Sequence, residues 1–321
     1  MRTRSTEGIQ PSLTVSDLLA DAAGYRLDLE LLAGAGGVER EIRVPRIQKP
    51  GLALAGYVAQ IRSHRVQILG ETELAYLATL DPATARANVA QVFEAGAACF
   101  VVTKGLEPPE YVAGHADRTR TPLLRTGLRS SVFIDRIDRF LADRLAPRVR
   151  IHGVLIDVME VGILLKGESG IGKSECALDL VRRGHRLVAD DVVEIRRYAP
   201  FRLVGTGLDL IRYHIEIRGI GILDIRELFG ITSVRDEKDV ELVVELVPWR
   251  EGEVYERLGL EERTQPILGV DVPYLRIPVA PGRSIASVVE VAARNHLLRR
   301  MGQHSAIRLA ERLDAALREE P

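Results

Sequence analysis

Cysteines and long apolar runs are scarce in this chain of 321 residues. Its two cysteines, Cys99 and Cys176, are too few for the disulfide framework of a small secreted domain. No apolar run approaches the length of about 18 residues that a transmembrane helix needs. The segment from Met1 to Glu7 lacks the apolar centre of a secretory signal peptide. We therefore expect a soluble, cytoplasmic protein.

An excess of charge of either sign is also missing. Lys and Arg number 44 and Asp and Glu number 45, so the formal net charge is −1. A nearly neutral chain has no general electrostatic attraction for nucleic acid or for an anionic membrane. We expect neither as a partner.

Apolar residues, in contrast, are plentiful at 46%, enough to build cores, and the length of the chain suggests two domains. Strand-like and helical segments alternate in the first part, which predicts an α/β domain. Ala146-Pro147 is typical of a linker, so we assign residues 1–146 to an N-terminal domain and 147–321 to a second domain. The second domain is expected to begin with one strand from Val149 to Val158.

One stretch of eight residues carries a specific chemical signal. Residues 167–174, GESGIGKS, match the phosphate-binding P-loop pattern G-x-x-x-x-G-K-[ST] at every fixed position. An apolar strand precedes the stretch and a helix follows it. The glycines allow backbone amides to converge on phosphate oxygens, Lys173 would neutralise the β- and γ-phosphates, and Ser174 would ligate Mg²⁺. A glycine-rich turn capped by Ser174 is the alternative, but it leaves the lysine unexplained.

Two adjacent acids, Asp190 and Asp191, follow a further short apolar strand. P-loop proteins usually keep a carboxylate beside the metal at such a position. We expect the two acids to divide the work, one near the metal and one facing a nucleophile. A solvated turn is the alternative.

Two other stretches are unusual. In residues 215–224, IEIRGIGILD, ionisable residues and glycines alternate with isoleucines. The alternation alone predicts a half-buried strand, whereas the glycines suggest a close approach of the backbone, and Glu216 could ligate a metal. Residues 278–283, PVAPGR, predict a rigid turn that presents Arg283 either to an anion or as a helix cap.

Taken in order, GESGIGKSE, RGHRLVADD, EIRGIGILDI, YERLGL and PVAPGR resemble the HPr kinase/phosphorylase family. The segment LGETELAYL resembles the N-terminal domain of the same family, so the similarity covers the whole chain. This resemblance implies ATP-dependent phosphorylation of a serine on HPr, the phosphocarrier of the sugar phosphotransferase system. It also implies phosphorolysis of that group by inorganic phosphate, giving pyrophosphate. The expected architecture is a P-loop domain like that of PEP carboxykinase, assembled into a homohexamer.

The resemblance also assigns roles to residues. It makes Lys173 the phosphate clamp and places Mg²⁺ on Ser174 and Glu216. Asp191 matches the residue that accepts the serine proton and returns it during phosphorolysis. ATP is expected on the whole loop, that is on Gly167, Glu168, Ser169, Gly170, Ile171, Gly172, Lys173 and Ser174.

His152 and Arg257 match further active-site residues, although neither is remarkable by itself. Ala280 and Ser284 stand where the family usually has arginine and asparagine, in a segment tied to phosphorolysis. The kinase activity is therefore the firmer of the two expectations.

A small-molecule kinase or a carboxykinase-like enzyme with the same loop is the main alternative, and it would require a polar pocket for a metabolite. A nucleotide-binding switch is a second alternative. The guanine-reading motif N-K-x-D is absent from the sequence, which disfavours a GTPase of this kind.

Overall fold

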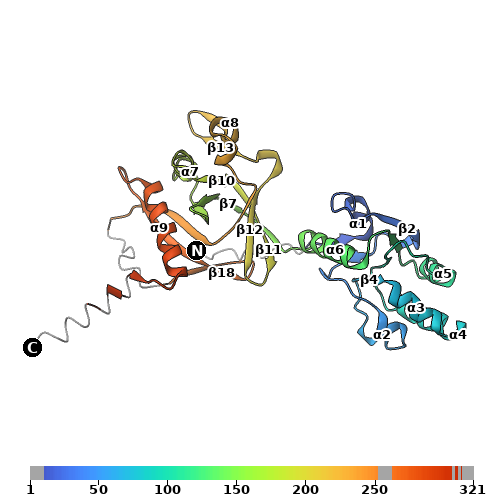
Figure 1. Ribbon diagram of the computed structural model, residues 1–321. Coiled ribbons are helices and arrows are strands. Elements are labelled where there is room, and N and C mark those ends of the chain that lie inside the picture. The colour runs from blue at the N-terminus through green and yellow to red at the C-terminus, as the bar shows by residue number, and fades with distance from the viewer. Residues whose placement is uncertain (1–10, 252–261, 306–307, 310–311, 313–321) are drawn as a thin grey trace, which may run out of the picture. The chain divides into compact units, whose positions relative to one another are not determined.

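The structure is a computed structural model that describes residues 11–251, 262–305, 308–309 and 312 (Figure 1). Arg257 therefore lies outside the described residues. The chain divides between Ala146 and Pro147 into two compact units, and each unit is described by itself.

The unit that ends at Ala146 is built on a four-stranded sheet in the order β2-β6-β5-β4. Strands β4, β5 and β6 are parallel, and β2 is an antiparallel edge strand. A two-stranded ladder of β1 and β3 lies apart from this sheet. The strands are β1 (Leu13–Thr14), β2 (Leu29–Ala33), β3 (Glu41–Ile42), β4 (Val66–Leu69), β5 (Cys99–Val102) and β6 (Leu123–Thr126).

Helices cover both faces of this sheet. Phe133, Ile137 and Phe140 on α6 pack with α1 against one face, whereas residues of α2 to α5 form a second apolar cluster on the other. The helices are α1 (Val15–Asp21), α2 (Gly51–Leu54), α3 (Glu71–Thr79), α4 (Pro82–Glu94), α5 (Glu110–Thr119) and α6 (Ser130–Arg144), with short 3₁₀ turns η1 (Ala35–Gly37) and η2 (Val58–Gln60). The alternation of strands and helices predicted an α/β unit, and this is what forms.

The second unit contains a six-stranded sheet in the order β10-β8-β9-β16-β18-β17. Its three central strands, β9, β16 and β18, are parallel, whereas β8 and β17 are antiparallel to their neighbours. The strands are β8 (Val154–Val158), β9 (Val161–Gly167), β10 (Arg186–Ala189), β16 (Leu242–Pro248), β17 (Thr264–Ile267) and β18 (Val270–Val279).

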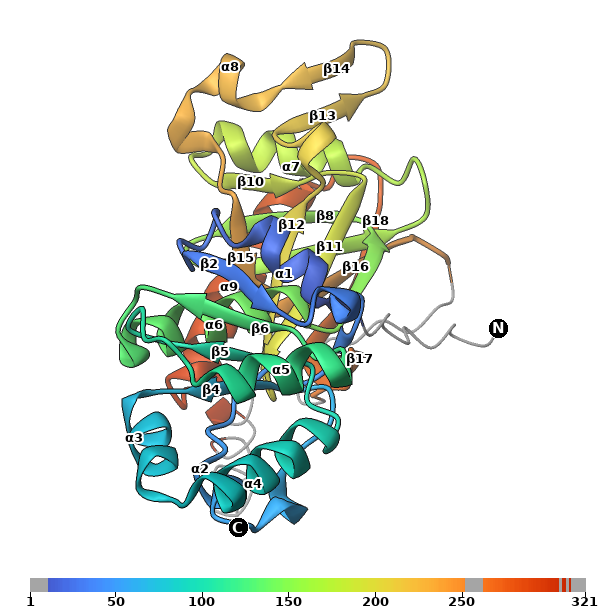
Figure 2. The same cartoon turned by 90° about the vertical axis from the view of Figure 1, so that its right-hand side faces the viewer.

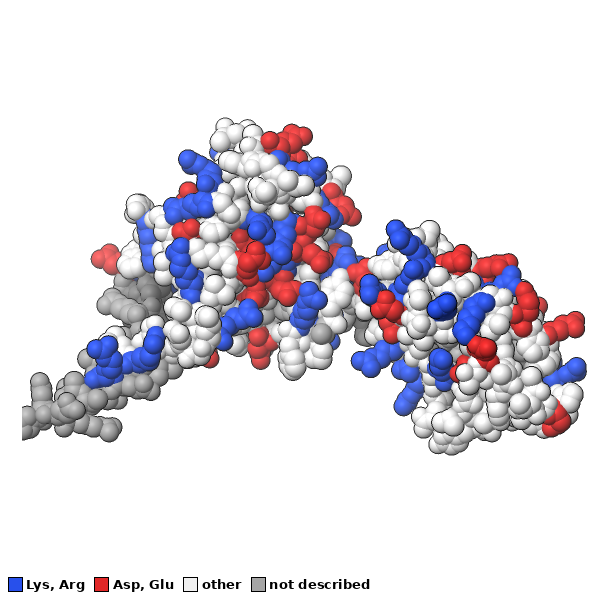
Figure 3. Space-filling model, in the orientation of Figure 1, with Lys and Arg blue, Asp and Glu red and all other residues white. Residues whose placement is uncertain are grey.

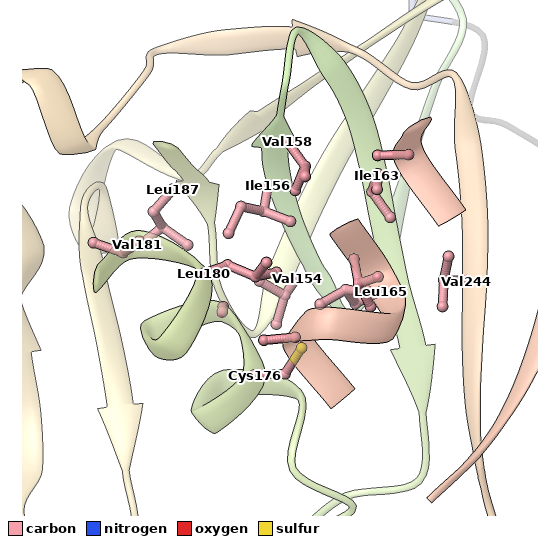
Figure 4. Packing of buried hydrophobic residues seen from close by; sticks show 14 of the residues in the cluster. Val154, Ile156, Val158, Ile163, Leu165, Cys176, Leu180, Val181, Leu187 and Val244 are labelled. Carbon is pink, nitrogen blue, oxygen red and sulfur yellow. The ribbon is translucent and has the colours of Figure 1, made fainter. Parts of the chain in front are cut away.

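Two further layers cover this sheet. Helices α7 (Lys173–Arg182) and α9 (Ile285–Arg300) pack on one face, where Figure 4 shows side chains of α7 meeting those of β8 and β9. On the other face lies an antiparallel sheet in the order β15-β12-β11-β7, and a second apolar cluster fills the space between the two sheets. Its strands are β7 (Arg148–His152), β11 (Val192–Ala199), β12 (Arg202–Gly207) and β15 (Glu237–Asp239).

The single strand expected from Val149 to Val158 is wrong. The chain leaves one sheet at His152 and enters the other at Val154, so β7 and β8 belong to different layers. The break is at Gly153, where a Cβ would lie 2.5 Å from the carbonyl oxygen of Leu165. The Gly153 amide donates to the carbonyl of Asp191 at 3.0 Å, which satisfies the backbone at the break.

A hairpin and a short helix complete the second unit. Strands β13 (His214–Ile217) and β14 (Gly221–Asp224) pair antiparallel, with η3 (Asp209–Ile211) before them and α8 (Ile225–Phe229) and η4 (Ile231–Ser233) after them. Figures 1 and 2 both place this hairpin beside α7. The region 215–224 is therefore two paired strands rather than one.

The two glycines in this hairpin allow the backbone conformation of its turn. Gly219 and Gly221 have φ of +84° and +111°, which side-chain-bearing residues rarely adopt. A Cβ at either position would meet nothing within 4 Å, so the close backbone approach expected from the sequence is not the reason for them.

Basic and acidic side chains are interspersed over the face seen in Figure 3, without a broad region of one sign. Among the described residues, no helix has both the length and the apolar character needed to cross a membrane.

Candidate functional site

The P-loop connects the carboxyl end of β9 to the first turn of α7. Gly167, Gly170 and Gly172 have φ of +144°, +83° and +103°, so three of the eight backbone positions are in conformations that favour glycine. At Gly167 a Cβ would also lie 2.5 Å from the carbonyl oxygen of Leu246 on β16. The loop therefore winds tightly around the amino end of a helix, where backbone N–H groups and the helix dipole favour an anion.

Lys173, the first residue of α7, is buried beneath this loop. Its Nζ donates hydrogen bonds to the carbonyl oxygens of Gly167 and Glu168, both at 3.0 Å. These bonds hold the ammonium group inside the curve of the loop, close to where the sequence pattern predicts phosphate.

Ile171 differs from the other loop residues in what its side chain contacts. This side chain is half-buried and packs against the apolar cluster beneath α7, and a Cβ on Gly167 would lie 3.1 Å from its Cγ2. The N–H of Ile171 donates to the carbonyl of Glu168 at 3.3 Å, within the loop itself. The side chain of Ile171 therefore faces the core rather than the pocket, because an apolar side chain gains more from the core than from a polar environment.

Strand order brings the first of the two acids to the loop. Strand β10 is antiparallel to β8, which is antiparallel to β9, so β9 and β10 end at the same edge of the sheet. Asp190 directly follows β10, and its carboxylate accepts the Ser174 hydroxyl at 2.9 Å and the backbone N–H of Glu216 at 3.1 Å. Burial raises the pKa of Asp190, although these hydrogen bonds act in the opposite direction.

The second acid has different surroundings. Asp191 has a φ of +67°, and its side chain is exposed and lies 3.0 Å from Nδ1 of His152. His152 is the last residue of β7 and pairs with Val192 at the start of β11. The two neighbouring carboxylates thus contact different partners: Asp190 contacts the Ser174 hydroxyl and Asp191 contacts an exposed imidazole.

Glu216 lies on β13 and its side chain is exposed. Its backbone N–H donates to the Asp190 carboxylate, which also accepts the Ser174 hydroxyl, so Glu216 lies close to both of these residues. No group of three or more His, Cys, Asp or Glu side chains suited to a metal ion occurs among the described residues. Mg²⁺, however, is commonly held by one or two carboxylates together with substrate phosphates and water. The hydroxyl and carboxylate oxygens of Ser174, Asp190 and Glu216 are donors of the kind this ion prefers.

These groups line one polar pocket of about 130 Å³. The described lining is His152, Ser169, Gly170, Gly172, Lys173, Ser174, Glu175, Asp190, Asp191, Glu216 and Arg218. Eight of these were predicted as site residues from the sequence, whereas the predicted loop residues Gly167, Glu168 and Ile171 do not line the pocket.

Asp190 and Arg218 are functional candidates that sequence reasoning left without a defined role. Asp190 was expected only as one of a pair, and Arg218 was not singled out at all. Arg218 had a detectable signal, because Glu216 and Arg218 are two residues apart and so fall on the same face of an extended segment.

The turn predicted at 278–283 is present only from Ala280 to Arg283, since Pro278 and Val279 are the last residues of β18, and it lies outside this lining. The N–H of Arg283 donates to the carbonyl of Ala280 at 3.2 Å, and Gly282 between them has a φ of +80°. The guanidinium of Arg283 donates to the carbonyl of Pro278 at 3.3 Å. The side chain of Ser284, rather than that of Arg283, caps α9.

Comparison with known proteins gives matches over both units. Residues 13–141 match the family described as "HPr Serine kinase N terminus", and residues 143–313 match "HPr Serine kinase C-terminal domain". A protein of Geobacter sulfurreducens named HPr kinase/phosphorylase is 50% identical over 310 residues, which is 97% of each chain. A protein of Leptospira biflexa with the same name is 44% identical over 96% of each chain.

Among solved structures, the HPr(Ser) kinase/phosphatase from Coxiella burnetii shares 36% sequence identity with this chain. The match covers 48% of this chain and 93% of that chain, with a TM-score of 0.45.

Proposed function

Because this chain belongs to the HPr kinase/phosphorylase family, we propose that it transfers a phosphoryl group from ATP to a serine of HPr. We propose that it also removes this group by phosphorolysis. The observation that best supports this function is the separation of the two acids beside the P-loop. Asp190 contacts the Ser174 hydroxyl, whereas Asp191 is exposed beside His152.

In the kinase direction, the amides of residues 167–174 and the ammonium group of Lys173 hold the β- and γ-phosphates. Ser174 and Glu216 would hold Mg²⁺, and Asp190 orients the Ser174 hydroxyl. When bound, the ion neutralises charge on the phosphates. We propose that the second unit has a P-loop fold like that of PEP carboxykinase, which the helix-covered mixed sheet supports.

Asp191 acts as the general base. The serine oxygen of HPr forms a bond to the γ-phosphorus while the bond to the β–γ bridging oxygen breaks, and ADP leaves. The serine proton passes to the Asp191 carboxylate, which is exposed and so can be reached by a protein substrate. His152 positions this carboxylate through its contact at 3.0 Å.

Phosphorolysis uses the same groups in the opposite sense. An oxygen of inorganic phosphate attacks the phosphorus of phosphoserine, the bond to the serine oxygen breaks, and pyrophosphate forms. Asp191, in its protonated form, donates a proton to the serine oxygen as this bond breaks, a role opposite to the one it has in the kinase direction. Arg257, which matches a family active-site residue, lies outside the described residues and its role is a proposal from the family alone.

The family also supports a homohexamer with the P-loop units at its centre. Sedimentation velocity would test this assembly, and a monomer at working concentrations would contradict it.

The decisive test of function is transfer of label from [γ-³²P]ATP to purified HPr. The matched control is HPr in which the acceptor serine is replaced by alanine. We expect label on HPr and none on the control. Label that persists on the control would contradict the proposed acceptor, and a lack of label on HPr would favour a small-molecule kinase. Addition of inorganic phosphate to labelled HPr should release labelled pyrophosphate.

A further inference from the structure

A second cavity in the C-terminal unit shares no described residue with the P-loop pocket. Its volume is about 360 Å³, compared with about 130 Å³ for the P-loop pocket. Cavities that bind small molecules usually measure about 300–1,000 Å³, so this one has the size of a ligand site. The described lining is Leu242, Glu262, Arg263, Thr264, Pro273, Tyr274, Leu275, Ala292, Asn295, His296, Arg299, Arg300 and His304.

This cavity lies at the opposite edge of the six-stranded sheet from the P-loop. Strand β9 ends at the loop, whereas the cavity contacts Leu242, the first residue of β16, which runs parallel to β9. Helix α9 forms the facing wall, where spacings of three and four residues place the lining residues on one face of the helix. These residues are Ala292, Asn295, His296 and Arg299. A ligand in this cavity would leave the phosphate site unoccupied.

The floor of the cavity is apolar. Leu242 and Ala292 belong to the buried cluster between α9 and the sheet, and Leu275 packs against this cluster. Pro273 on β18 adds a further apolar surface. Such a floor offers no hydrogen bonds, so it favours the hydrocarbon part of a ligand over hydroxyl groups.

One wall carries an imidazole whose hydrogen-bonding capacity is unused. Within the described part of the chain, Nε2 of His296 is buried and has no hydrogen-bond partner. Burial lowers the pKa of His296, so the ring is uncharged at neutral pH. An unpaired buried atom of this kind costs free energy. A rotation of the ring about its Cβ–Cγ bond, which is a soft torsion in histidine, would turn Nε2 towards a ligand.

Positive charge predominates around these groups. The described lining contains three arginines, Arg263, Arg299 and Arg300, but one carboxylate, that of Glu262. Glu241, which lies outside this lining, pairs with Arg300. The cavity therefore favours a negatively charged group on its ligand over a positively charged one.

We propose that this cavity binds a small organic anion in which a carboxylate is joined to an apolar body. The body contacts the floor at Leu242, Leu275 and Ala292. The carboxylate accepts N–H groups from the side-chain amide of Asn295 and from the rotated ring of His296, both of which line the cavity. Neither ATP nor a phosphoryl group takes part, so this inference goes beyond the proposed function and does not depend on it.

The test is isothermal titration calorimetry of the full chain with three probes. The probe 2-naphthoate has a carboxylate on an apolar body, 2-naphthamide has the same body without the charge, and sulfate has charge without the body. We expect 2-naphthoate to bind and 2-naphthamide to bind at least about tenfold more weakly, because hydrogen bonds to a charged group are stronger. Sulfate should not displace 2-naphthoate. Saturating ATP should leave its affinity unchanged, since the two sites lie at opposite edges of the sheet.

Variants identify the cavity as the binding site. Asn295→Leu and His296→Leu each remove a donor and keep a side chain of similar size, so each should weaken 2-naphthoate binding at least about fivefold. Ala292→Phe fills the floor and should abolish binding. The matched control is Arg294→Gln, which should bind like the wild type, since Arg294 is an exposed residue of α9 outside the lining. The urea midpoint of each variant checks that it is folded.

The absence of binding by 2-naphthoate would overturn the inference, as would equal affinity for 2-naphthamide. Displacement by sulfate would show that any anion is accepted, and competition with ATP would place the probe at the P-loop, so either result also overturns it. Unchanged affinity in Asn295→Leu, or an equal loss in Arg294→Gln, would contradict the cavity as the site, whether or not Ala292→Phe folds. A failure to label HPr would contradict the proposed function and leave these results as they are, so the two proposals fail separately.

Discussion

Asp190 and Asp191 show how far the surroundings of adjacent residues can differ. The buried Asp190 accepts hydrogen bonds from the Ser174 hydroxyl and from the backbone N–H of Glu216. Asp191 adopts a left-handed backbone conformation and contacts His152 instead. A residue with positive φ turns the chain sharply, so the side chains of Asp190 and Asp191 do not alternate between two faces as they would in a regular strand. We expect the two acids to respond differently to the same substitution.

Asp191→Asn should lose about 10²- to 10⁴-fold in transfer to HPr while ATP binding is kept, because a general base contributes an effect of this size. The measurement is single-turnover labelling of HPr beside equilibrium nucleotide binding. Asp209→Asn is the matched control, since Asp209 is an exposed acid paired with Arg212 outside the site lining. An equal loss of transfer and of ATP binding would instead indicate that Asp191 maintains structure or holds the metal.

Asp190→Asn should change the dependence of stability on pH. Burial raises the pKa of Asp190 in the folded protein, so the folded state binds this proton more tightly than the unfolded chain does. The group therefore contributes stability below the usual pKa of an aspartate, and this contribution is lost as the pH rises through the raised pKa. The variant removes the titration.

Relative to the wild type, Asp190→Asn should gain stability between about pH 4 and pH 7, the range above the usual aspartate pKa, while transfer activity falls. Urea unfolding of both proteins at the two ends of this range measures the difference. A variant that loses stability relative to the wild type as the pH rises would show that the hydrogen bonds from Ser174 and Glu216 outweigh burial.

At the scale of elements, the break at Gly153 determines where the candidate base lies. It separates β7 from β8, which belong to different sheets. His152 is therefore the last residue of β7, and Val154, two residues later, is the first residue of β8. The hydrogen bond from the Gly153 amide to the carbonyl of Asp191 joins this break to the acid. Glycine is needed because the carbonyl of Leu165 on β9 occupies the space of a Cβ.

Gly153→Ala should therefore destabilise the protein by about 1–3 kcal/mol, the usual cost of forcing an extra group into a packed region. Transfer activity should fall as well, since His152 and Asp191 would shift. Gly114→Ala is the matched control: Gly114 lies within α5, and a Cβ there meets nothing within 4 Å. This control should gain about 0.5–1 kcal/mol, because alanine is the better helix former. Equal urea midpoints for the two variants would contradict the role of Gly153.

At the scale of the whole molecule, each unit has cores of its own. The clusters on the two faces of the β2-β6-β5-β4 sheet consist of residues between Leu13 and Leu145. Those on the two faces of the six-stranded sheet consist of residues from Ile151 onward. A unit that buries its own apolar surface in this way meets the main requirement for folding alone.

A fragment of residues 10–146 should accordingly fold and unfold cooperatively when produced by itself. The check is a urea transition followed by circular dichroism and by near-ultraviolet absorption, which should coincide for a two-state domain. Transitions that separate, or the lack of any transition, would show that this unit depends on the rest of the chain.

The sequence by itself determined the P-loop pattern of residues 167–174, since its glycines, lysine and hydroxyl lie within eight residues of one another in the chain. It also predicted the α/β character of both units, because the periodicity of apolar residues is local. Only the tertiary structure decided which acid meets Ser174, that Ile171 packs into the core, how the chain divides at Gly153 and where Arg218 lies. These depend on strand order and on backbone turns that bring distant segments together, and no local pattern encodes which partner a side chain will find across a sheet.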